Sequence, residues 1–133
     1  MTWAELHRVL LERGLIRAGD AARADAAVDA VSGIAFDSRV VKPRNVFVAL
    51  RGLHADGTMY VHQAIDRGAV AIVSEATAPS DVHVPWATVE DARRALALIS
   101  AAFFQYPSDE MQVVGITGTN GKTTTAYLVA SIF

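Results

Sequence analysis

The first residues of the chain combine a helix start signal with apolar side chains at helical spacing. Thr2 and Glu5 have the arrangement of a capping box, in which a hydroxyl and a carboxylate satisfy the first free N–H groups of a helix. The apolar positions that follow recur every three or four residues, and Gly14 is placed to end the helix. These apolar positions are Trp3, Leu6, Val9 and Leu10. The pattern predicts an amphipathic helix that packs its apolar side on a core.

Short apolar runs later in the chain predict strands that alternate with helices. The expected strands are 32–36, 46–50, 69–73 and 86–89. The run 69–73 is apolar throughout, which is typical of a parallel strand covered on both faces. The alternation favours an α/β fold with a small, mainly parallel sheet and flanking helices.

Two helices are expected between and after these strands. Residues 60–67 predict a helix closed by Gly68. A longer helix is expected after Thr88, its predicted cap, with Glu90 and Asp91 near the positive end of the helix dipole. Its apolar stripe consists of Ala92, Ala95, Leu96, Ile99 and Phe103. The alanine-rich stretch 20–30 is compatible with either a short helix or a loop.

A proline-containing break at 106–109 predicts a domain boundary. We expect a first domain over 1–108 and the beginning of a second over 109–133. In the second, 111–116 predicts a strand, 117–122 a loop, and the residues from Thr123 onward a helix.

Composition narrows the function classes without naming one. The chain has 133 residues, 52% of them hydrophobic and 20% charged, as in a compact α/β domain. No apolar run approaches the roughly 20 residues of a membrane span, and the N-terminus does not resemble a signal peptide. The absence of cysteine is compatible with a cytoplasmic location, and a net charge of −2 gives no global attraction for nucleic acid.

The sequence VGITGTNGKTTT at 114–125 carries the most chemistry. A strand, a glycine-rich loop and a helix N-terminus in this order present backbone N–H groups to a phosphate. Lys122 would reach the β- and γ-phosphates of ATP, and the Thr123 hydroxyl would help to hold Mg²⁺. The general phosphate-loop pattern requires glycine where Ile116 stands, so the match is to the narrower form TGTNGKT. The alternative is a glycine-rich turn with an exposed lysine.

This loop resembles that of the ATP-dependent Mur ligases, and most that of the MurE type. The residues that carry the resemblance are GTNGKTTT and the preceding Tyr106-Pro107-Ser108. Upstream, Asp37-Ser38-Arg39, 46–49, 52–57 and 89–93 resemble the UDP-binding domain of the same type. The resemblance covers nearly the whole chain after about Ser32. It departs at Arg44, where the family commonly has glycine after proline.

The resemblance implies a set of site residues. Ser38 and the loop residues Leu53, His54 and Ala55 would contact the uridine end of a UDP-sugar, while Arg39 would support that site or pair with Asp37. ATP would lie on the loop, with Lys122 as the catalytic residue and Thr123 at Mg²⁺. The ATP-binding residues would be Thr117, Gly118, Thr119, Asn120, Gly121, Lys122, Thr123 and Thr124. Asp37-Ser38-Arg39 alone could equally be a turn with a local ion pair.

The implied reaction joins a diamino acid, meso-diaminopimelate or L-lysine, to UDP-MurNAc-L-Ala-D-Glu in peptidoglycan synthesis. The remaining ligands of the central domain and the diamino acid site would lie beyond Phe133, so we expect the chain alone to be inactive. We also expect residues after about Asp109 to be mobile, to pair with the first sheet, or to associate with another chain. Two other interpretations remain: the Mur ligase that adds D-Ala-D-Ala, and a non-catalytic module that binds uridine nucleotides.

Overall fold

The fold is a four-stranded parallel sheet with helices on both faces. The strands lie side by side in the same order as they occur in the sequence. The computed structural model describes residues 1–17, 30–52 and 56–132. The strands are β1 (Gly33–Ala35), β2 (Asn45–Ala49), β3 (Ala71–Ser74) and β4 (Trp86–Thr88), paired in the order β1-β2-β3-β4. All three pairings are parallel, which confirms the expected sheet.

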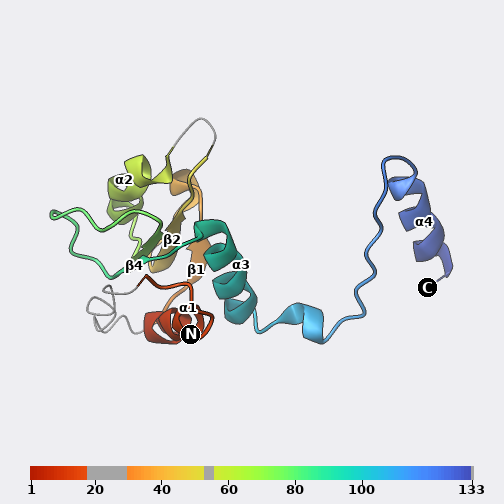
Figure 1. The fold of residues 1–133 in the computed structure, drawn as a ribbon, viewed down its shortest axis with the longest axis horizontal. Helices are drawn as coiled ribbons and strands as arrows, with labels where there is room; N and C mark the ends of the chain where they lie inside the picture. Colours follow the sequence, from red (N-terminus) through yellow and green to blue (C-terminus); the bar gives the residue numbers. More distant parts are fainter. Residues whose placement is uncertain (18–29, 53–55, 133) are drawn as a thin grey trace.

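Helices α1 (Trp3–Glu12) and α3 (Ala92–Phe103) cover one face of this sheet. Val46, Val48 and Val73 point into this layer, where they pack with Trp3 and Ile99. Because successive side chains of a strand alternate between faces, the intervening residues belong to a second apolar layer. Figure 1 shows α1 and α3 beside the sheet.

The opposite face of the sheet packs against α2 (Val61–Asp66). Phe47, Ile72 and Trp86 from the sheet form this layer with Val61 and Ala64 from the helix. Trp86 donates its indole N–H to the Ala76 carbonyl at 3.0 Å, which satisfies its polar atom inside the core. The two apolar layers explain why β2 and β3 are buried at every position.

Helix ends follow the signals in the sequence at three of four positions. Thr2 and Glu5 form the predicted capping box of α1, and Gly14 follows that helix with φ +67°. Gly68 follows α2 with φ +98° and donates its N–H to Ile65. The predicted cap of α3 was wrong: Thr88 is the last residue of β4, and Asp91 accepts the N–H of Arg94 at 2.9 Å.

The segment after α3 contains two short helical elements. A 3₁₀ turn, η4 (Pro107–Asp109), stands at the break expected from the proline, and α4 spans Lys122–Ile132. The expected strand over 111–116 does not form; these residues are irregular and mostly exposed. An isolated extended segment leaves its N–H and C=O groups to water, and no described strand lies beside it to form a ladder. Figure 1 shows α4 at the end of this segment, apart from the sheet.

Of the stretch 20–30, only Ala30 belongs to the described residues. Leu53, His54 and Ala55 lie outside them. No helix of the described chain is both long enough and apolar enough to cross a membrane.

Candidate functional site

A cavity of about 550 Å³ opens where β1 and β2 end. Ligands of open α/β sheets bind at the carboxyl ends of their strands, and this cavity lies there. Its wall combines aromatic rings with a few polar groups, as in most small-molecule sites. The lining residues are Phe36, Asp37, Ser38, Arg39, Phe47, Leu50, Gly57, Tyr60 and Gln63.

The turn η2 (Ser38–Val40) is held by the residue that precedes it. Asp37 accepts the backbone N–H of Arg39 at 2.9 Å and, in addition, binds its guanidinium. The contacts run from Nε to both carboxylate oxygens at 2.9 and 3.1 Å and from a terminal nitrogen at 2.7 Å. These hydrogen bonds lower the pKa of Asp37 to about 2 and raise that of Arg39. Arg39 is therefore paired with Asp37, which is one of the two roles expected for it.

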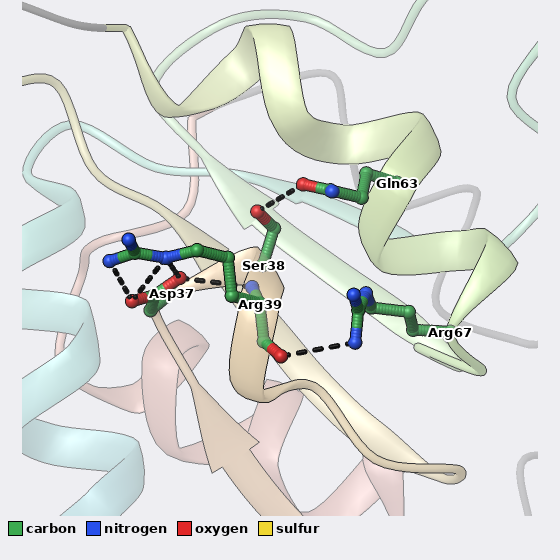
Figure 2. A network of polar contacts seen from close by, with 5 residues as sticks. All are labelled: Asp37, Ser38, Arg39, Gln63 and Arg67. Carbon is green, nitrogen blue, oxygen red and sulfur yellow. Dashed lines mark hydrogen bonds and ion pairs between the residues drawn. The ribbon is translucent and has the colours of Figure 1, made fainter.

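Ser38 is buried at the centre of this turn and points toward α2. The residue is 6% exposed, and its hydroxyl donates to the Oε1 atom of Gln63 at 2.6 Å. Arg67, at the end of α2 and four residues after Gln63, donates to the Arg39 carbonyl at 3.1 Å. Figure 2 shows both links between η2 and α2. The predicted residue Ser38 thus lies on the cavity wall in a fixed orientation.

The chain returns to the cavity at Gly57 after the loop that follows β2. The Gly57 N–H donates to the Leu50 carbonyl at 2.9 Å, and a Cβ at Gly57 would lie 2.6 Å from that oxygen. Asp56 accepts from the N–H and hydroxyl of Thr58, which lowers the pKa of Asp56. The predicted contacts Leu53, His54 and Ala55 belong to the undescribed part of this loop, and their role stays a prediction.

A second, smaller cavity of about 250 Å³ lies toward β3. It carries opposite charges, with Arg17 and Arg51 against Asp56 and Glu75. The first cavity differs because the two charged groups on its wall, Asp37 and Arg39, neutralise each other at contact distance. A neutral, flat ligand group therefore fits the first cavity better than a free anion does.

The predicted phosphate loop is described from Thr117 to Thr124, and none of its residues lines either cavity. Gly118 and Gly121 adopt φ +146° and +78°, which only glycine accommodates without strain. Lys122 begins α4, one residue earlier than expected, and its ammonium donates to the carbonyls of Gly118 and, at 3.5 Å, Thr119. Thr123 and Thr124 occupy the first turn of the helix, and Thr117, Thr119 and Asn120 stand exposed in the loop.

The predicted site residues thus form two groups, Ser38 in the sheet cavity and the loop with the start of α4. Tyr60 and Gln63 line the cavity but were not predicted. Gln63 precedes the buried Ala64 on α2, and hydrophobic periodicity does not distinguish it from the other polar residues of this six-residue helix. Within the described ranges, no three acidic or histidine side chains converge as a metal site would require.

Comparisons with known proteins identify the family. Residues 30–104, more than half of the chain, match the family described as "Mur ligase family, catalytic domain". The chain is 50% identical over 102 residues to UDP-N-acetylmuramoyl-L-alanyl-D-glutamate--2,6-diaminopimelate ligase of Solibacter usitatus, covering 77% of this chain and 21% of that protein. It is 50% identical over 118 residues to the protein of the same name from Chlorobaculum tepidum, covering 87% and 22%.

The chain therefore spans about a fifth of the length of these relatives. Among solved structures, crystal structure I of MurF from Acinetobacter baumannii matches with a TM-score of 0.70 and 25% identity, covering 98% of this chain and 27% of that one. This match supports the sheet and helix arrangement described above. The chain belongs to the Mur ligase family.

Proposed function

We propose that residues 1–108 form the UDP-sugar-binding domain of an ATP-dependent ligase and that 109–133 begin its ATP-binding domain. The ligase would add a diamino acid to UDP-MurNAc-L-Ala-D-Glu during peptidoglycan synthesis. The observation that carries the proposal is the cavity at the ends of β1 and β2, with Ser38 fixed on its wall. Its size and mixture of aromatic and neutral polar groups suit a uracil ring.

In this reaction, ATP phosphorylates a substrate carboxylate to give an acyl phosphate and ADP. The amine of the diamino acid then displaces phosphate and forms the amide. The sheet domain would contribute by holding the uridine end of the acceptor substrate, so that the distant carboxylate reaches the ATP site in a defined position. Leu53, His54 and Ala55 would complete the contacts to the UDP-sugar.

The loop residues Thr117, Gly118, Thr119, Asn120, Gly121, Lys122, Thr123 and Thr124 would hold ATP. Two glycines with positive φ and an 11-residue helix that begins at Lys122 fit a phosphate group. The Lys122 ammonium would act on the phosphates, and the Thr123 hydroxyl would hold Mg²⁺. Residues 111–116 form no strand, so the backbone before the loop is not preorganised and ATP should bind weakly to this chain.

The names of the relatives favour a diamino acid as the amine substrate. Both relatives at 50% identity are named for 2,6-diaminopimelate. The MurF structures and a structure named as a D-alanyl-D-alanyl ligase are 25–30% identical to the chain, so the D-Ala-D-Ala-adding ligase is the second candidate. Tyr106-Pro107-Ser108 and Thr119 also favour the diamino acid type.

The test is a calorimetric titration of the 133-residue chain with UDP-MurNAc-L-Ala-D-Glu. We expect saturable binding that Ser38→Ala weakens by about fivefold or more, since a hydrogen bond in the site is lost. Ser108→Ala, the same change at an exposed serine, should leave the affinity unchanged. Binding that is equally strong in the Ser38→Ala variant would contradict the proposed site.

A further inference from the structure

The contact between Ser38 and Gln63 determines which way a hydroxyl proton points at the wall of the cavity. The two residues are 25 positions apart, on η2 and α2, and their side chains meet at 2.6 Å. Figure 2 shows the Ser38 hydroxyl directed at the Gln63 oxygen, with the Gln63 nitrogen beyond it. Ser38 is buried and Gln63 is exposed, yet both line the cavity.

The direction of this hydrogen bond leaves two complementary groups for a ligand. A serine hydroxyl has one proton, and Ser38 gives it to Oε1 of Gln63, so Oγ can only accept further hydrogen bonds. The amide nitrogen of Gln63 has two N–H donors, and within the described ranges it donates to no protein group. The cavity wall therefore presents an acceptor and, next to it, a donor.

The acceptor of Ser38 and the donor of Gln63 are complementary to uracil and not to cytosine. Uracil presents an N–H at N3 beside a carbonyl at C4, which matches an acceptor beside a donor. Cytosine presents an unprotonated N3 beside an amino group, which is the reverse order. Phe36 and Tyr60, 61% and 43% exposed on the same wall, offer ring faces on which either base can stack. Stacking thus contributes affinity, while the polar pair decides between the bases.

We infer that Gln63 is a positioning residue that makes this cavity select uracil over cytosine, by fixing the Ser38 hydroxyl as an acceptor and donating to the C4 carbonyl. The inference rests on the proposed uridine site. Without Gln63 the Ser38 hydroxyl can rotate and donate to N3 of cytosine, so the selectivity disappears even though Ser38 remains.

The experiment compares UDP and CDP as ligands of the 133-residue chain by NMR titration, which measures weak affinities. The unchanged chain should bind UDP about tenfold or more tightly than CDP, as expected for a two-point polar readout of a base. In Gln63→Met, which keeps the length of the side chain and removes both polar atoms, the ratio should fall close to one. Gln112→Met makes the same change at an exposed residue outside the cavity and should keep the original ratio.

Three results would overturn the inference, and they separate it from the proposed function. Equal binding of UDP and CDP by the unchanged chain would exclude selection while leaving the uridine site intact. Weakening of both ligands by the same factor in Gln63→Met, with the ratio unchanged, would reduce Gln63 to a packing role. Failure of every uridine nucleotide to bind would contradict the proposed function as well.

Discussion

At the scale of single residues, the wall of the cavity depends on how Asp37 and Arg39 neutralise each other. The carboxylate accepts four hydrogen bonds from one arginine, three from its side chain and one from its backbone. Paired in this way, the two groups carry no net charge, and Ser38 between them is held in the turn. An exposed pair contributes little to stability, so its main effect is on geometry.

Replacing Arg39 should return Asp37 to ordinary titration behaviour. In the folded chain the pKa of Asp37 is lowered from 3.8 to about 2, first by the Arg39 side chain. In Arg39→Gln we expect the pKa of Asp37 to rise toward 3.8. An NMR titration of the Asp37 carboxyl group measures this change. Because the folded pKa is the lower one, the pair stabilises the fold above about pH 3.8, and this contribution is lost as the pH falls toward 2.

Arg94→Gln is the control for this titration, since Arg94 is an exposed arginine on α3. It should leave the pKa of Asp37 at about 2. An Asp37 pKa that stays equally low in Arg39→Gln would show that the Arg39 side chain is not its cause.

The resemblance to the Mur ligases pointed to Ser38, whereas nothing in the sequence pointed to Gln63. Without that resemblance, Asp37-Ser38-Arg39 is only a turn with a local ion pair, whose residues interact over two positions. The partner of Ser38 lies 25 residues away, and only the packing of α2 on the sheet brings it there. Contacts of this kind follow from tertiary structure, for which the sequence pattern of a six-residue helix gives no information.

At the scale of elements, Gly68 fixes the connection from α2 to β3. Its φ of +98° is accessible to glycine, and a Cβ there would lie 2.8 Å from Cα of Pro43. We expect Gly68→Ala to lower the free energy of unfolding by more than about 1 kcal/mol, through backbone strain and the clash together. Urea denaturation measures the change.

Gly115→Ala is the matched control for Gly68→Ala. No atom lies within 4 Å of a Cβ at Gly115, and its φ is not in the left-handed region. This substitution should change the free energy of unfolding by less than about 0.5 kcal/mol. Equal effects of the two substitutions would show that the Gly68 turn carries no strain.

The elements that the sequence predicted correctly are those whose signals are local or strongly periodic. The capping box of α1 and the apolar run of β3 are examples. The cap of α3 was misplaced because Thr88 and Asp91 are both good capping residues, and only the end of β4 decides between them. The strand over 111–116 failed for a related reason, since an apolar run becomes a strand only beside another strand.

At the scale of the whole molecule, every described buried apolar side chain lies between Trp3 and Ala102. The large apolar residues of the later segment, such as Val113, Tyr127 and Ile132, are 71–79% exposed. The cohesion of the described chain therefore comes from the sheet and its three helices.

Ending the chain at Ser108 should leave the stability of this sheet domain unchanged. We expect the free energy of unfolding of residues 1–108 to agree with that of the full chain within about 0.5 kcal/mol, because no core contact is removed. Chemical denaturation followed by tryptophan fluorescence suits the comparison, since both tryptophans, Trp3 and Trp86, are buried. A loss of several kcal/mol would contradict the proposed boundary at 108.

The central claim is that the cavity at the ends of β1 and β2 receives the uridine end of the substrate. An NMR titration of the ¹⁵N-labelled chain with UDP tests it most directly. We predict saturable shifts centred on the backbone amides of Phe36, Ser38, Gly57 and Gln63. Shifts centred instead on Arg17, Ser74 and Glu75 at the second cavity, or no saturable shift at all, would contradict the claim.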